Sequence, residues 1–218
     1  MIVSESSARR YALDPDVRLM LQVRDDSAAA FEELVMRYQD RLVMVLKHLV
    51  GSRELAEDLT QEVFLRVYRA RKSYQPGSKF STWLFTIANH TAANALRNQS
   101  RRHEVMLQGR DSGPLGPRSL DRMIAASSGQ MPARLFDKTE MREIVQAALG
   151  SLNERQRMAV LLSKFEGMSY IEIAEAMEMS PKAIKSLLSR ARGNLREVLQ
   201  PYFDDGIRPN LNPQNNND

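Results

Sequence analysis

The stretch from Ser169 to Leu199 constrains the fold of this chain more than any other, because it predicts two helices separated by a short break. Apolar residues recur at helical spacing over Tyr170–Met177, which predicts a short first helix. Ser180 followed by Pro181 is a typical helix start, since a Ser side chain caps the first turn and Pro is tolerated at the first helical position. Two helices joined in this way are typical of a helix-turn-helix, whose second helix enters the DNA major groove.

The second of these helices has an apolar face and a basic face. Ile184, Leu187 and Leu188 share the arc that is predicted to face a core. No acidic residue occurs between Pro181 and Arg196, whereas solvated helix faces commonly mix both signs of charge, so DNA binding is favoured over a merely solvated face. The candidate base contacts lie toward the N-terminal half and the candidate phosphate contacts farther along: Lys182, Lys185, Ser186, Ser189 and Arg190, then Arg192 and Arg196.

Composition excludes several other classes of function. The 218 residues include no Cys, so a thiolate metal site, a disulfide framework and a cysteine nucleophile are impossible. The three histidines have no metal-ligand spacing, and no Gly-rich phosphate loop is present. No signal peptide or apolar run of about 20 residues is found, so we expect no membrane insertion and a cytoplasmic protein.

Helical periodicity is found in residues 14–102 and 138–203 but is lost between them. The intervening residues 103–137 are rich in Gly, Pro and Ser and predict a flexible linker with at most one helical turn, at Leu120–Ala126. Residues 1–13 are expected to be a flexible leader and residues 204–218 a disordered tail. The chain is therefore predicted to be all-α, with two small helical domains joined by a flexible linker. The expected helices are Asp16–Arg24, one capped by Ser27, one from Ser52 to about Lys72, one from near Ser81 to about Arg101, Thr139–Leu149 and Ser151–Phe165, with a break at Gly51-Ser52.

The helix after Ser52 carries a surface that suits a protein partner. Its apolar positions share one arc, and the opposite arc combines acidic and amide side chains with one apolar residue. An ordinary solvated face with one exposed Leu is the alternative interpretation. The candidate partner-binding residues are Asp58, Gln61, Glu62 and Leu65.

The segment Lys79–Arg101 combines aromatic, amide and basic side chains. Such a set can stack unpaired bases and hold the backbone beside them. A buried aromatic cluster with a polar helix end is the alternative, and it applies best to Trp83 and Phe85. The candidate single-strand contacts are Lys79, Phe80, Trp83, Asn89, His90, Asn94, Arg97 and Arg101.

Three motifs in this order and spacing resemble the extracytoplasmic-function sigma factors, the small two-domain members of the bacterial sigma-70 family. They are LAEDLTQEVFLRVYRA, FSTWLFTIANHTAANALR and SLNERQRMAVLLSKFEGMSYIEIAEAMEMSPKAIKSLLSRARGNLREVL. The resemblance covers nearly the whole chain except the leader, linker and tail. It implies that the first domain is sigma region 2 and that the second is sigma region 4, a winged-helix-like domain of four helices.

The resemblance also implies partners and roles. Asp58, Gln61 and Glu62 would dock on the clamp helices of the β′ subunit of core RNA polymerase, and residues 76–102 would recognise and melt the −10 promoter element with a flipped base. The helix-turn-helix would bind the −35 promoter DNA as duplex and contact the β flap, while the linker would run toward the RNA exit path. An anti-sigma factor is a further expected partner.

Two positions depart from the family pattern. His90 stands where many members have Asn, which affects the −10 base preference. Leu187 stands where Arg is frequent, and because it falls on the apolar arc we expect it to alter packing more than base contacts.

Two rival functions are a stand-alone helix-turn-helix regulator that binds duplex DNA without polymerase, and an enzyme with a helical catalytic domain. The candidate surfaces at Asp58–Leu65 and Trp83–Asn94 disfavour the first. For the second, Asp58 and Glu62 offer paired carboxylates, but no nucleophile and base converge with them. We therefore expect no catalytic residue, no cofactor, no metal and no small-molecule substrate.

Overall fold

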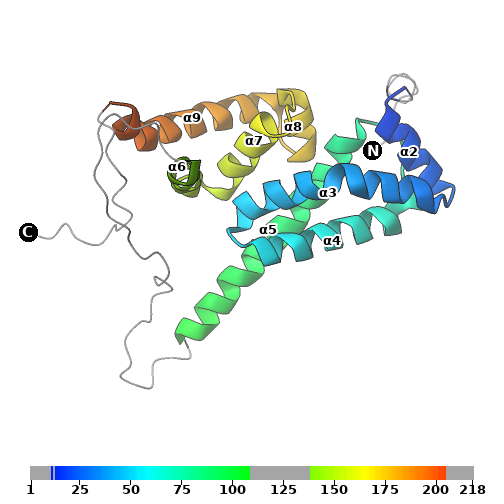
Figure 1. Ribbon diagram of the computed structural model, residues 1–218, viewed down its shortest axis with the longest axis horizontal. Helices are drawn as coiled ribbons and strands as arrows, with labels where there is room; N and C mark the ends of the chain where they lie inside the picture. The colour runs from blue at the N-terminus through cyan, green and yellow to red at the C-terminus, as the bar shows by residue number, and fades with distance from the viewer. Residues whose placement is uncertain (1–10, 12, 109–137, 205–218) are drawn as a thin grey trace, which may run out of the picture.

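The computed structural model describes residues 11, 13–108 and 138–204, and these form helices and connecting turns without any strand. The all-α prediction is confirmed for this part of the chain, and the C-terminal four helices have no β-wing within it. The helices, drawn in Figure 1, are α2 (Pro15–Arg24), α3 (Ala28–Val50), α4 (Arg53–Ala70), the 3-10 turn η1 (Arg71–Ser73), α5 (Phe80–Gln108), α6 (Lys138–Gly150), α7 (Glu154–Lys164), α8 (Tyr170–Ala176) and α9 (Pro181–Asp204).

The N-terminal domain is built from α2 to α5, and its helix boundaries follow from local capping chemistry. Ser27 and Ser52 accept hydrogen bonds from backbone N–H groups in the first turns of α3 and α4. Gly51 ends α3 in the left-handed conformation, with φ of 78°, which Gly adopts without strain. The predicted break at Gly51-Ser52 is thereby confirmed. Helices α3, α4 and α5 pack on one another, and α2 covers α3.

Helix α5 is longer than predicted, because it continues through Gln108, past the expected end near Arg101 and into the predicted linker. In Figure 1 its C-terminal half projects away from the other helices. No Gly or Pro occurs between Phe80 and Gln108, so the chain contains no residue that would stop the helix earlier. The helical turn expected at Leu120–Ala126 lies outside the described residues.

The C-terminal domain consists of α6 to α9. Helix α7 begins at Glu154 rather than at Ser151, because Asn153 and Gln156 form a capping box that sets the start. A second capping box, between Ser169 and Glu172, starts α8. The predicted start of the second helix of the helix-turn-helix is confirmed, since the N–H of Ala183 donates to Ser180 Oγ at 3.2 Å.

The two domains pack side by side, which the sequence did not predict. Helices α7 and α8 form a layer between α9 and the N-terminal domain, with α7 against α3 and α8 against α5 (Figure 1). One hydrophobic cluster of buried residues runs through both domains. Arg157 forms hydrogen bonds with both domains. Its guanidinium donates to the Leu49 carbonyl near the end of α3, at 3.1 Å. It also donates, at 2.8–3.1 Å, to three carbonyls at and just after the end of α6, those of Leu149, Gly150 and Leu152.

Candidate nucleic-acid and protein interfaces

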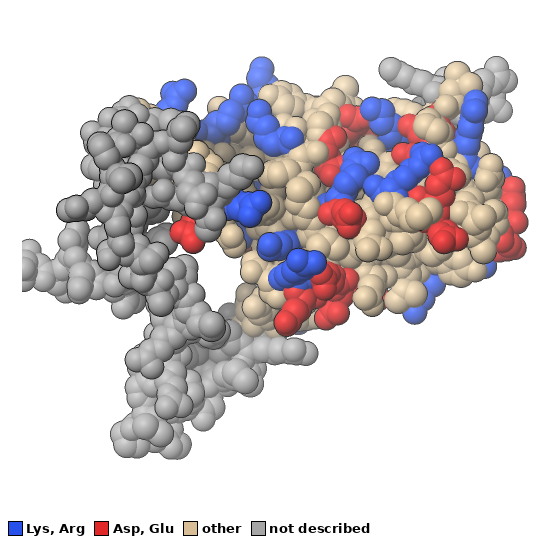
Figure 2. Space-filling view, in the orientation of Figure 1, with Lys and Arg blue, Asp and Glu red and all other residues tan. Residues whose placement is uncertain are grey.

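Helix α9 presents its basic residues to solvent and its apolar residues to the core. All seven candidate contacts, Lys182, Lys185, Ser186, Ser189, Arg190, Arg192 and Arg196, are exposed. Figure 2 shows Lys and Arg side chains gathered along α9 at the upper edge of the molecule. Leu187 is only 8 % exposed and belongs to the core, so its predicted packing position is confirmed. The result is a helix with a continuous basic face that faces away from the N-terminal domain.

Two arginines on this face are partly held by neighbours. Arg192 Nε donates to the Leu188 carbonyl at 3.2 Å, and its Nη2 lies 3.4 Å from Tyr170 Oη on α8. Arg190 Nη2 lies 3.4 Å from Ser186 Oγ, which is long for a hydrogen bond. No ion pair joins any of the seven residues to a carboxylate within the described chain, so their charges are available to phosphates and bases.

The candidate protein-binding residues share one exposed face of α4. Asp58, Gln61 and Leu65 are exposed, Leu65 to 50 %, and Glu62 is half-buried beside Arg66, whose Nε lies 2.7 Å from Glu62 Oε1. The spacing of these residues at i, i+3, i+4 and i+7 places them on one stripe. An apolar side chain as exposed as Leu65, flanked by acidic and amide groups, suits a partner with apolar and basic residues.

Gln61 and Leu65 also line a groove of about 890 Å³ between α3 and α4, which the sequence did not reveal. Phe31 of α3 and Tyr68 of α4 both line it and contact each other, with ring centroids 5.1 Å apart, and the Arg71 guanidinium lies 4.0 Å from the Tyr68 ring centroid. Tyr68 is exposed and was missed as a site residue. Its position, three residues after Leu65 on the same helix, is the signal that could have identified it.

The candidate single-strand contacts lie on α5 or directly before it, and they differ in exposure. Lys79, His90, Asn94, Arg97 and Arg101 are exposed, and Asn89 and Trp83 are half-buried. Phe80 is fully buried, and its ring packs against those of Tyr38 and Trp83 at centroid distances of 5.2 and 6.0 Å. Phe80 therefore has no surface in this structure to offer to DNA, and it supports Trp83 instead.

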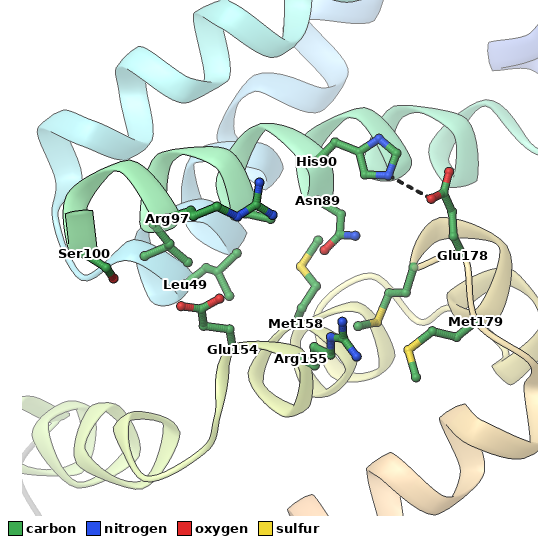
Figure 3. A pocket seen from close by; sticks show the side chains of 13 residues that line it. Leu49, Asn89, His90, Arg97, Ser100, Glu154, Arg155, Met158, Glu178 and Met179 are labelled. Atoms are coloured by element: carbon green, nitrogen blue, oxygen red, sulfur yellow. Dashed lines mark ion pairs between the residues drawn. The ribbon is translucent and has the colours of Figure 1, made fainter. Parts of the chain in front are cut away.

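The exposed side of α5 faces the C-terminal domain across a cleft. This cleft, of about 670 Å³, is lined on α5 by Asn89, His90 and Arg97 and on the other side by residues of α7 and the α8–α9 turn (Figure 3). His90 Nε2 lies 3.2 Å from Glu178 Oε2 at one end of it. Arg97 also donates to Asn94 Oδ1 at 3.2 Å.

A second contact between a side chain of the N-terminal domain and a carboxylate of the C-terminal domain joins the start of α5 to α8. Lys79 Nζ lies 2.7 Å from Glu172 Oε1. Burial acts to raise the pKa of Glu172, but hydrogen bonds from Lys79 and from the Ser169 backbone outweigh it and hold this pKa below its usual value. The same carboxylate raises the pKa of Lys79, so both side chains are charged at neutral pH.

Within the described residues, no group of three or more His, Asp or Glu side chains is arranged to hold a metal ion. In the same part of the chain no helix combines the length and the apolar character needed to cross a bilayer. Neither Asp58 nor Glu62 lines the two cavities described above.

Comparisons with known proteins give the same assignment for both domains. The family model for Sigma-70 region 2 matches residues 34–102, and that for Sigma-70, region 4 matches residues 142–195. The chain is 33% identical over 188 residues to the ECF RNA polymerase sigma-E factor of Escherichia coli K12, covering 86% of this chain and 96% of that one. It is 32% identical over 195 residues to the ECF RNA polymerase sigma factor SigE of Mycolicibacterium smegmatis, covering 88% of this chain and 71% of that one.

Two solved structures have a similar fold. The sigma factor RpoE of Bartonella quintana, in complex with the anti-sigma factor NepR, matches with a TM-score of 0.55 at 27% identity and covers 78% of this chain and 96% of that one. CnrH in complex with the cytosolic domain of CnrY matches with a TM-score of 0.60 at 22% identity, covering 86% of this chain and 98% of that one.

Proposed function

Because the chain belongs to the extracytoplasmic-function sigma factors of the sigma-70 family and is an RNA polymerase sigma factor, we propose that it joins core polymerase through α4 and reads promoter DNA through α5 and α9. The observation that carries this division is that α4 and α9 expose distinct chemistries. The stripe Asp58–Leu65 of α4 is acidic, amide and apolar, whereas α9 from Lys182 to Arg196 exposes basic side chains and no acidic one. The packing of the fold requires neither of these surfaces, so both are free to bind partners.

The α4 surface is the proposed contact for the β′ clamp helices. Leu65 is the apolar anchor, with Asp58, Gln61 and Glu62 placed to pair with basic and polar groups around it. The groove beside Leu65 and Tyr68 would receive an apolar side chain of the partner. The C-terminal domain would make a second contact with polymerase, at the β flap.

The α9 surface is the proposed reader of the −35 element. Lys185, Ser189 and Arg190 would reach base edges in the major groove, where Lys and Arg recognise guanine. Lys182, Ser186, Arg192 and Arg196 would hold the phosphates and fix the register of the helix on the duplex.

The α5 surface is the proposed site for the −10 element. Trp83 would stack on an unpaired base, with Phe80 buried behind it, while Asn89, His90 and Asn94 contact base edges and Lys79, Arg97 and Arg101 hold the backbone. Melting would come from capture of unpaired bases rather than from ATP, and capture must return the few kcal/mol that unstacking costs.

An anti-sigma factor is a further proposed partner, supported by the similar RpoE structure, which is a complex with the anti-sigma factor NepR. We place the protein in the cytoplasm, since that is where core polymerase acts in bacteria.

The proposed role of α4 is tested by measuring the affinity for core RNA polymerase. The double variant Asp58→Ala/Glu62→Ala should raise the Kd for core by about tenfold or more, because it removes the charges that surround the Leu65 anchor. Folding should be unaffected, since the exposed Glu62–Arg66 pair contributes only about 0.5 kcal/mol.

The matched control is Glu32→Ala/Glu143→Ala, which removes two exposed carboxylates from α3 and α6. The control should bind core like the wild type, and both variants should retain −35 duplex binding. An unchanged Kd in the α4 variant, or DNA binding by a wild-type protein that forms no complex with core, would contradict the proposal and favour a stand-alone regulator.

A further inference from the structure

Two ion pairs and one histidine–carboxylate contact cross the junction between the two domains, and in all three the carboxylate comes from the same domain. Arg41 of α3 pairs with Glu166, Lys79 with Glu172 at 2.7 Å, and His90 of α5 with Glu178 at 3.2 Å. The cationic or imidazole side chain always belongs to the N-terminal domain and the carboxylate to the C-terminal domain. The three carboxylates lie before, within and after α8, the first helix of the helix-turn-helix.

Two of these N-terminal partners, Lys79 and His90, belong to the proposed −10 surface. A carboxylate at 2.7 Å from Lys79 occupies the place that a DNA phosphate would take. Resting on the proposed function of α5, we infer that the α8 region is an internal mimic of the −10 strand: Glu172 and Glu178 hold the free protein in a closed form in which promoter and carboxylates compete for the same side chains.

The block is selective for one promoter element. Helix α9 lies on the far side of α7 and α8 from the N-terminal domain (Figure 1). Its basic residues are exposed in the closed form. The closed protein can therefore engage duplex DNA through α9 while Lys79 and His90 of the proposed −10 surface are engaged by Glu172 and Glu178. Separation of the domains is then a step that −10 recognition requires and −35 recognition does not.

Several features of the junction favour separation of the two domains. The side chain of Glu166 is fully buried, and its Oε1 has no hydrogen-bond partner in the described structure, so opening returns a half-satisfied carboxylate to water. The cleft of about 670 Å³ leaves the junction incompletely packed. Met158, Met177 and Met179 line the wall that the C-terminal domain forms. A junction of this kind is held at its edges by ion pairs, which salt weakens.

The backbone at Glu178 adds an independent observation. Its φ of 53° lies in the left-handed region, which Gly or Asn occupies more readily than Glu. The residue forms the turn between α8 and α9, where a Gly would relieve this strain. The backbone conformation at position 178 disfavours Glu. The contact between the Glu178 carboxylate and His90 explains why Glu is nevertheless found there.

The inference is tested on the full chain by the distance between the domains. The chain has no Cys, so Arg69→Cys on α4 and Glu143→Cys on α6, both at exposed positions, can be spin-labelled specifically. Electron-spin distance measurement should give one narrow distribution at low salt. Adding Glu172→Gln and Glu178→Gln should lower the ratio of closed to open molecules on the order of tenfold, and high salt should lower it in the parent protein.

Three controls separate the ion pairs from general effects. Glu175→Gln removes an exposed carboxylate from the same helix and should leave the distances unchanged. Lys79→Glu should open the protein, and combining it with Glu172→Lys should close it again, because the pair is restored with reversed polarity. Glu178→Gly should open the junction while leaving the thermal stability of the protein equal or higher, since it relieves the left-handed backbone.

A second measurement links opening to promoter use. Without the labels, Glu172→Gln/Glu178→Gln should reach half-maximal open-complex formation with core polymerase at a several-fold lower protein concentration, with −35 duplex affinity unchanged. Unchanged distances in all the Glu variants, or opening in the Glu175→Gln control alone, would overturn the inference. Opening without any gain in promoter use would instead overturn the proposed −10 site and keep the ion-pair closure, so the two failures are distinguishable.

Discussion

Replacing Lys185 and Arg190 together by Ala should weaken binding to the −35 duplex by about 2–6 kcal/mol, which is roughly 30-fold or more in Kd. Each side chain is exposed on the N-terminal half of α9, where it can reach base edges, and each lost base contact costs about 1–3 kcal/mol. The measurement is fluorescence anisotropy with a duplex that the wild-type protein selects from a random library, at several salt concentrations.

The control for this prediction is Arg142→Ala/Lys164→Ala, which removes two exposed positive charges from the same domain but outside α9. That variant should lose affinity only slightly and equally for all sequences, because remote charges act through the general field. The α9 variant should also lose discrimination between the selected duplex and a scrambled one. Equal losses in both double variants would show that α9 supplies charge and does not read bases.

Replacing Phe80 by Ala should destabilise the N-terminal domain by about 3–5 kcal/mol, because it empties a fully buried aromatic position. The ring packs against Tyr38 of α3 and Trp83 of α5, so its loss affects the packing of both helices. Trp83 is the single tryptophan of the chain, and urea unfolding followed by its fluorescence reports the change.

Phe165→Ala is the matched comparison for Phe80. Phe165 is an exposed ring that lies 5.6 Å from the His48 ring, and its removal should cost less than about 1.5 kcal/mol. If Phe80→Ala left the unfolding free energy unchanged but abolished −10 strand binding, Phe80 would be a direct DNA contact and its assignment to the core would be wrong.

The helices and their ends could be predicted from the sequence because they depend on local chemistry. A cap such as Ser52 or Ser180 acts within three residues, and Gly51 adopts its left-handed conformation without distant support. The apolar arc of α9 likewise follows from periodicity alone, so Leu187 could be assigned to the core before the fold was known.

The junction between the domains could not be predicted, because its contacts join residues that are far apart in the chain. Arg41 and Glu166 are separated by 125 positions, and neither lies in a pattern that marks it as a partner of the other. Arg157 reaches the end of α3 across 108 positions, and nothing in its surroundings in the sequence distinguishes it from an ordinary surface arginine. The groove at Tyr68 was missed for the same reason, since one wall belongs to α3 and the other to α4.

The central claim is tested most directly by transcription in a purified system. Core RNA polymerase, the protein and a library of bacterial promoter fragments are combined, and the 5′ ends of the transcripts are sequenced. We predict initiation at a subset of promoters that share two short motifs at a constant spacing, abolished or strongly reduced by Lys185→Ala/Arg190→Ala and by Asp58→Ala/Glu62→Ala. Transcripts that are equally abundant without the protein, or the absence of any shared motif, would contradict the account.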